Sequence, residues 1–169
     1  MIHIRHSLTT SAVAVALALA PAALADAGGT ARPFTGTAEG QVTFPVDPSC
    51  PLGVRTTWTA IGTLNHLGLA AAAGDHCADL PNLATNGQIT LVAANGDRLY
   101  GTYSGTNQPG MPPPIGGTIT GDTQVKITGG TGRFASAGGQ LHMIAHITFE
   151  GFDDPTWPAA FTWTGTLSY

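Results

Sequence analysis

From Thr30 onward, apolar and polar residues alternate with a period of two, and turn residues recur about every ten positions. A helix would instead repeat its apolar residues every three or four positions. The pattern therefore predicts an antiparallel all-β domain. Eight segments fit it, at 33–44, 54–62, 64–72, 86–95, 97–105, 117–128, 139–150 and 160–168.

The first and last predicted strands resemble each other. Both "FTGTAEG", from Phe34, and "FTWTGTLS", from Phe161, alternate threonine with apolar or glycine residues. Pairing them would remove the two edges that an open sheet leaves unpaired. We therefore expect an eight-stranded antiparallel closed barrel, whose interior is either filled by side chains or holds one small ligand.

The N-terminal segment has the features of a secretory signal peptide. Arg5 precedes an apolar run that ends in the small-residue site Ala23-Leu24-Ala25. A membrane anchor is the alternative, but a run of about fourteen residues is short of the roughly twenty that span a bilayer. We predict a signal peptide at 1–25, a single barrel domain at 26–169, and export either to a periplasm or outside the cell.

Removal of the signal peptide would take Arg5 with it. The remaining chain has five Lys and Arg residues against ten Asp and Glu residues, a net charge of −5. No basic patch or run is present, which argues against nucleic acid and an anionic membrane surface as partners.

The two cysteines, Cys50 and Cys77, are expected to form a disulfide in an exported chain. A zinc site built from these two residues and His76 is the alternative. It lacks a C-x-x-C pair, and adjacent His and Cys side chains rarely reach the same ion.

Several turns and loops can be placed. Asn95-Gly96 predicts a type I′ hairpin, and the proline-rich segment 107–117 predicts a long, stiff loop at the rim of the barrel. Segment 151–160 would form a similar loop. The alanine-rich stretch 68–77 fits either a strand end or one turn of helix, because its glycines limit helix length.

The segment "ITGGTGRFASAGGQ", at 127–140, contains five glycines around one phenylalanine. Gly129, Gly130 and Gly132 would permit a tight reversal with positive φ, and Gly138 and Gly139 a second bend. We expect Phe134 and Ala135 to plug one end of the barrel. A phosphate-binding loop would need a Lys and a Ser or Thr that are missing here.

The same stretch, "GGTGRFASAGG", resembles the Gly-Gly-Thr-Gly-(Lys/Arg)-Phe-x-x-Ala-x-Gly signature of plant dirigent proteins and allene oxide cyclases. The resemblance implies their eight-stranded barrel, a hydrophobic small molecule in its lumen, and steering of coupling or cyclisation by substrate shape and a few polar groups. It also implies self-association as a trimer. The signature is structural, so it identifies a scaffold rather than a reaction.

Three residues are weak catalytic candidates. His142 and His146 alternate with an apolar face of the seventh strand, so they line the lumen only if that apolar face points outward. Glu39 lies on the polar face of the first strand and would be a lumen acid only if that face points inward. For all three, the surface interpretation is favoured.

No nucleophile or cofactor motif is found, and no metal site is expected. Asp153-Asp154 and the pair Asp75 and Asp79 lack the spacing of a calcium loop and fit turns.

Three functions remain open. The first is a secreted barrel that binds a small hydrophobic molecule, and the second is a structural or interaction protein with a packed lumen. The third is a small outer-membrane barrel, suggested by the alternation of Phe161, Trp163 and Leu167 with threonines in the last strand.

Overall fold

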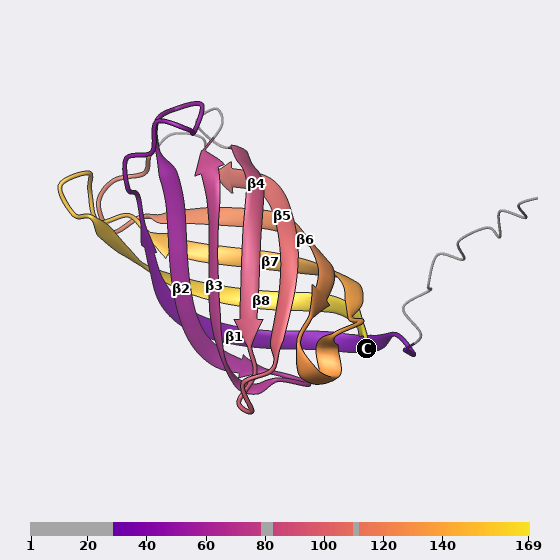
Figure 1. Ribbon diagram of the computed structural model, residues 1–169. Coiled ribbons are helices and arrows are strands. Elements are labelled where there is room, and N and C mark those ends of the chain that lie inside the picture. The colour runs from indigo at the N-terminus through magenta and orange to yellow at the C-terminus, as the bar shows by residue number, and fades with distance from the viewer. Residues whose placement is uncertain (1–28, 79–82, 110–111) are drawn as a thin grey trace, which may run out of the picture.

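The computed structural model describes residues 29–78, 83–109 and 112–169, so the predicted signal peptide at 1–25 lies outside the described residues. The chain forms a closed eight-stranded barrel, as the alternation predicted (Figure 1). Its elements are β1 (Arg32–Thr43), β2 (Arg55–Leu64), β3 (Gly68–Ala78), β4 (Leu83–Val92), β5 (Arg98–Gln108), β6 (Thr118–Gly130), the 3₁₀ helix η1 (Gly132–Phe134), β7 (Gly138–Thr148) and β8 (Thr156–Ser168).

Each strand pairs antiparallel with the next one along the chain, and β1 pairs with β8. This closing pair runs from Arg32 opposite Leu167 to Thr43 opposite Thr156, so the whole of β1 is engaged. The predicted closure is confirmed. Closure leaves no free edge strand in the barrel, which protects it from edge-to-edge association.

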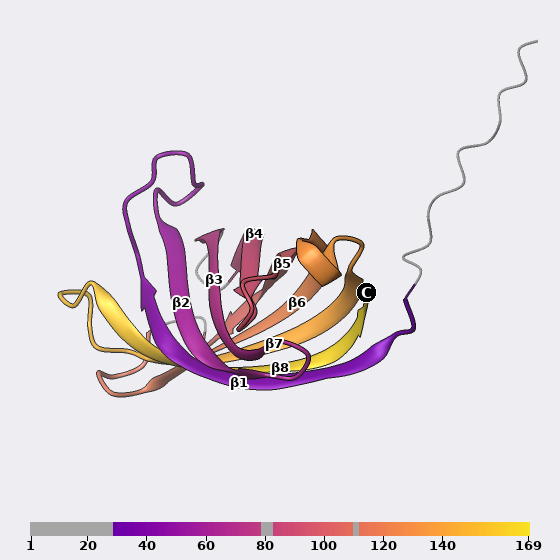
Figure 2. The same cartoon turned by 60° about the horizontal axis from the view of Figure 1, so that its bottom comes forward.

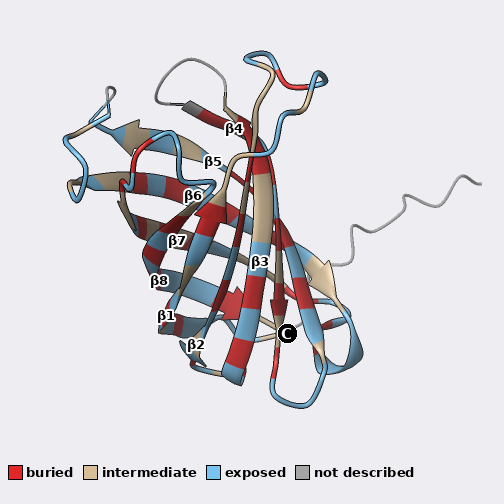
Figure 3. Ribbon diagram, turned by 90° about the vertical axis from the view of Figure 1, so that its left-hand side faces the viewer, coloured by how far each residue is buried: buried red, intermediate tan, exposed pale blue. Residues whose placement is uncertain are grey.

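Buried and exposed residues alternate along the strands, and the buried set forms one core inside the barrel (Figure 3). On β1, Phe34, Ala38 and Val42 face inward as expected. On β8, Phe161 and Trp163 also face inward, and threonines cover the outside. The pattern behind the outer-membrane hypothesis is therefore reversed, because the apolar residues of this strand fill the lumen instead of facing lipid.

The connections divide the barrel into two unlike ends. The connections 65–67, 93–97 and 131–137 lie at one end together with the C-terminus, and we call this the closed end. The connections 44–54 and 149–155 and the described part of the β5–β6 connection, 109 and 112–117, lie at the other end, which we call the mouth (Figures 1 and 2). Among the described residues, no helix is long and apolar enough to cross a membrane.

The glycine-rich segment closes the closed end as predicted, but Gly130 ends β6 without a positive φ, and Gly138 and Gly139 begin β7 instead of forming a second bend. Gly129 and Gly132 take positive φ values of 146° and 56°, which lets the chain turn into η1. The Phe134 side chain is fully buried under this turn. The expectation for Ala135 was wrong: it is exposed, and Ala137 is the second buried residue, because the 3₁₀ turn points Ala135 outward.

Two local predictions also change, for the β4–β5 turn and for the loop 151–160, and the open choice for the alanine-rich stretch is decided. The β4–β5 hairpin exists, but of its two turn residues only Gly96 has a positive φ, so it is a type I turn followed by a left-handed glycine rather than type I′. The alanine-rich stretch is strand, because β3 pairs along both edges and extends to Ala78. The predicted loop 151–160 is shorter, since β8 already begins at Thr156.

Candidate functional site

A cavity of about 580 Å³ opens at the mouth, while the rest of the lumen is filled by the core. Its wall is mainly apolar, with one buried histidine and a few polar groups. The lining residues are Phe44, Val54, Thr56, His76, Ala78, Asn107, Pro109, Pro112, Ile119, Ile147, Phe152, Asp153, Asp154, Pro155 and Trp157.

Aromatic side chains separate this cavity from the packed part of the barrel. Trp58 of β2 packs against Phe161 with ring centroids 4.8 Å apart and against Tyr103 of β5 at 6.4 Å. Glycines on the neighbouring strands make room for them. A Cβ on Gly74 would lie 2.6 Å from the Trp58 ring, and a Cβ on Gly87 would lie 2.7 Å from the Tyr103 ring.

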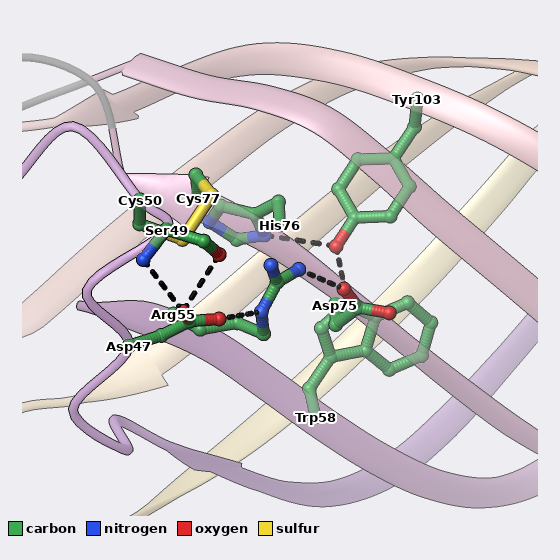
Figure 4. A network of polar contacts seen from close by, with 9 residues as sticks. All are labelled: Asp47, Ser49, Cys50, Arg55, Trp58, Asp75, His76, Cys77 and Tyr103. Atoms are coloured by element: carbon green, nitrogen blue, oxygen red, sulfur yellow. Dashed lines mark hydrogen bonds and ion pairs between the residues drawn. A yellow bond between two sulfur atoms is a disulfide. The ribbon is translucent and has the colours of Figure 1, made fainter. Parts of the chain in front are cut away.

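A chain of hydrogen bonds links these aromatic residues to His76 (Figure 4). The Trp58 indole N–H donates to the Tyr103 hydroxyl oxygen at 2.8 Å, and that hydroxyl lies 2.8 Å from His76 Nδ1. The indole N–H, the hydroxyl and Nδ1 are all paired when the hydroxyl donates to Nδ1, which assigns the imidazole proton to Nε2. Nε2 has no protein partner among the described residues, and His76 lines the cavity.

Burial controls the protonation of both groups. It lowers the pKa of His76 to about 4, an effect that Asp75 opposes and Arg55 reinforces. Burial also raises the pKa of Tyr103 well above its usual range. At neutral pH the cavity therefore presents a neutral imidazole with a single hydrogen-bond donor.

A β-bulge in β4 lies at the level of these two side chains. The pairing register shifts between Asp75 and Cys77 on one side and between Ala84 and Gly87 on the other. Asn86, inside the bulge, takes a positive φ of 53°. Bulges bend strands and re-aim side chains, and here the bend lies directly beside His76 and Tyr103.

The β1–β2 connection is held against the outside of the barrel rim (Figure 4). The Arg55 Nε lies 2.6 Å from Asp47, and its Nη1 lies 2.6 Å from Asp75. Hydrogen bonds from Ser49 and Arg55 lower the pKa of Asp47 to about 2. The predicted disulfide between Cys50 and Cys77 is confirmed, and Cys77 directly follows His76. Both cysteines are thereby used, so the alternative zinc site is wrong.

A second aromatic group forms the cavity wall next to the β7–β8 connection. Trp157 lies 4.2 Å from Phe44 and 4.9 Å from Phe149, measured between ring centroids. Its indole N–H donates to the backbone carbonyls of Gly151 and Asp154, which fixes the connection to the start of β8. Phe152 extends the wall outward, 5.3 Å from Phe149.

The three residues singled out from the sequence lie outside the lumen. His142 Nε2 donates to the Asp122 carboxylate at 2.6 Å on the outer face, His146 is exposed, and Glu39 is exposed on β1. All three side chains therefore lie on the surface, as the favoured interpretation predicted. The reason is the apolar face of β7, whose burial turns the two histidines outward.

Sequence reasoning missed His76 as a cavity residue. The signal was present, because His76 is in phase with the inward-facing Ala70, Ala72 and Gly74. Ending the third strand at residue 72 hid that phase. Trp58 and Tyr103 were missed because their contact joins residues 45 positions apart.

Acidification should destabilise the fold through His76. Its folded pKa of about 4 lies below the usual 6.5, so between these values the unfolded chain binds the proton more readily and stability falls as pH falls. Each pH unit is worth about 1.4 kcal/mol, so the full loss by pH 4 is roughly 3 kcal/mol. Urea unfolding from pH 7 to 4 measures it.

The matched control is His76→Gln, whose amide can still accept from Tyr103. This variant should lack most of the decline between pH 6.5 and 4. Equal declines in the two proteins would mean that His76 is not held neutral. The facing charges, Arg55 and Asp75, remain in both proteins, so the difference isolates the imidazole.

Comparisons of the chain with protein-family models, with curated proteins and with solved structures found no match. Within the described part of the chain, no group of three or more His, Cys, Asp or Glu side chains is arranged to hold a metal ion. Functional inference therefore depends on the cavity itself.

Proposed function

We propose that this chain is an exported barrel that binds a small hydrophobic molecule in the mouth cavity, with an oxygen atom of the ligand accepting a hydrogen bond from His76. The observation that carries the proposal is the cavity of about 580 Å³ whose wall contains buried His76, with an Nε2 that no described residue pairs. Cavities of this volume, apolar with few polar groups, are typical of small-molecule sites.

Three further points support the proposal. The Trp58–Tyr103–His76 chain fixes the imidazole before any ligand arrives, which reduces the entropy cost of binding. A neutral donor is suited to a carbonyl, ether or hydroxyl oxygen. Export is supported by the signal-like N-terminus and by the buried disulfide, a bond typical of oxidising compartments. The dirigent and cyclase resemblance implies the same location for a ligand.

Two neutral fluorescent probes test the site. Nile red carries a carbonyl oxygen, whereas N-phenyl-1-naphthylamine offers no oxygen acceptor. We expect both to bind, with Ile147→Trp raising both dissociation constants by about tenfold or more because the new ring fills the cavity. Ile144→Trp is the matched control, since Ile144 lies on the same strand but outside the cavity lining.

The hydrogen bond is tested separately with His76→Phe, which keeps a ring of similar size. We expect Nile red to bind about two- to tenfold more weakly, the usual value of one neutral hydrogen bond, and the naphthylamine to be unaffected. If neither probe binds the folded wild type, the packed structural barrel is the better interpretation. Equal losses for both probes would remove the role of His76.

A further inference from the structure

Large apolar side chains at the mouth are exposed on three separate connections. Exposure is greatest for Val46 at 83 % and Phe152 at 79 %, followed by Ile115 at 72 % and Leu52 at 53 %. We call these four residues the mouth tips. Solvent exposure of this many large apolar side chains at one end of a barrel indicates an interaction surface.

The connections that carry the mouth tips are held in place. Backbone hydrogen bonds join Gly116 and Gly117 to Phe149, so the β5–β6 and β7–β8 connections are tied together. The β1–β2 connection is held by the disulfide and by Arg55. Prolines are frequent in these segments, and they restrict the backbone. A proline also has no backbone N–H that would lose a hydrogen bond to water. The mouth tips are therefore presented on preorganised connections that need little further ordering when they contact a surface.

The charges of the described chain are distributed unevenly between the two ends. Near the mouth lie five carboxylates and one guanidinium, and towards the closed end lie four cations and one carboxylate, Asp97. The mouth groups are Asp47, Asp75, Glu150, Asp153, Asp154 and Arg55, the cations are Arg32, Arg98, Lys126 and Arg133, and Glu39 and Asp122 lie on the barrel wall between the ends. An acidic mouth is repelled by an anionic surface.

We propose that the mouth docks onto a neutral, zwitterionic lipid surface, with the mouth tips entering the interface. A second copy placed mouth to mouth would bring the two sets of carboxylates together, which disfavours a symmetric dimer through this face. Asp153 and Asp154 directly follow Phe152, so they restrict insertion to the headgroup level. Phe152 also lines the cavity, which makes the apolar path from the lipid to His76 continuous.

Vesicle flotation with phosphatidylcholine tests this proposal. We expect the wild type to float, and Ile115→Ser with Phe152→Ser to lower its partition coefficient by at least about tenfold. The matched control is Ile61→Ser with Leu69→Ser, because these residues are 64 % and 67 % exposed on the barrel wall. The control should change partitioning by less than about twofold, and an anionic lipid added to the vesicles should weaken wild-type binding severalfold.

A conservative variant gives a direct readout. Phe152→Trp should bind like the wild type and shift its emission to the blue when phosphatidylcholine vesicles are added, since the three native tryptophans, Trp58, Trp157 and Trp163, are already buried. Failure of the wild type to float, equal losses in both serine pairs, or an unshifted emission would each overturn the proposal. So would a change in sedimentation between wild type and the tip pair, which would identify a second copy as the occupant.

Docking is a separate property from ligand binding, so either one can fail while the other holds. In buffer without vesicles, a second tip variant, Val46→Ser with Ile115→Ser, should bind Nile red with less than about a threefold change in dissociation constant, because neither residue lines the cavity. If the protein binds vesicles but not the probes, docking is supported and ligand binding is not. If it binds the probes but not vesicles, docking is overturned and ligand binding stands.

Discussion

Phe134→Ala is expected to lower the free energy of unfolding by about 3 to 5 kcal/mol, the usual cost of truncating a buried phenylalanine. Phe134 is fully buried at the closed end and packs against Tyr169 with ring centroids 4.9 Å apart. The Arg133 guanidinium lies over its outer ring face and donates to the backbone carbonyl of His66. The surrounding turns are thus held in place and have little freedom to fill the space that truncation leaves.

Urea unfolding at neutral pH measures this loss. Ser136→Ala is the matched control, because Ser136 is exposed on the same connection and should change stability by less than about 0.5 kcal/mol. Nile red binding by the folded Phe134→Ala variant should be unchanged, since the cavity lies at the opposite end. A loss below about 1 kcal/mol would show that Phe134 does not act as a plug.

Replacing both cysteines, as Cys50→Ser with Cys77→Ser, is expected to cost roughly 3.5 kcal/mol, because the disulfide spans 27 residues and restricts the unfolded chain. Arg55 still joins Asp47 to Asp75 in the variant, so the β1–β2 connection keeps part of its native position. The expected loss is therefore mainly the entropy that the unfolded chain regains.

Denaturant unfolding of the oxidised wild type and of the double serine variant measures the difference. Reductant should bring the unfolding midpoint of the wild type close to that of the variant and leave the variant unchanged. Because both cysteines are buried, reduction of the native protein should be slow and accelerate under mildly denaturing conditions. Equal stability of the oxidised wild type and the double serine variant would contradict the prediction.

The mouth cavity gives the chain a chemistry that its composition does not suggest. The described residues that converge there are mostly apolar, and the one buried histidine is kept neutral and oriented by Trp58 and Tyr103. Its neighbours Arg55 and Asp75 lie on the outside of the rim and pair with each other. The arrangement places the neutral imidazole donor inside the cavity and keeps the Arg55–Asp75 ion pair on the outer surface.

Much of the fold could be predicted because strand periodicity is a local property. The inward phase of β1 and the buried Phe134 follow from patterns that short stretches of sequence carry. The closing pair with β8 followed from the count of eight strands and the likeness of the first and last, and the disulfide followed from the two cysteines and the expected export. The type of the β4–β5 turn could not be predicted from the sequence. Asn95 is compatible with either sign of φ, and the pairing of the flanking strands decides which sign it takes.

The sequence by itself determined the eight-stranded closed barrel, the outward position of His142, His146 and Glu39, and which end is sealed. Only the tertiary structure decided where the lumen stays open and which polar group faces it. The contacts of His76 with Tyr103 and of Tyr103 with Trp58 join three strands, and the β4 bulge sets their relative height. Such contacts depend on register and volume across the barrel, which no local pattern encodes.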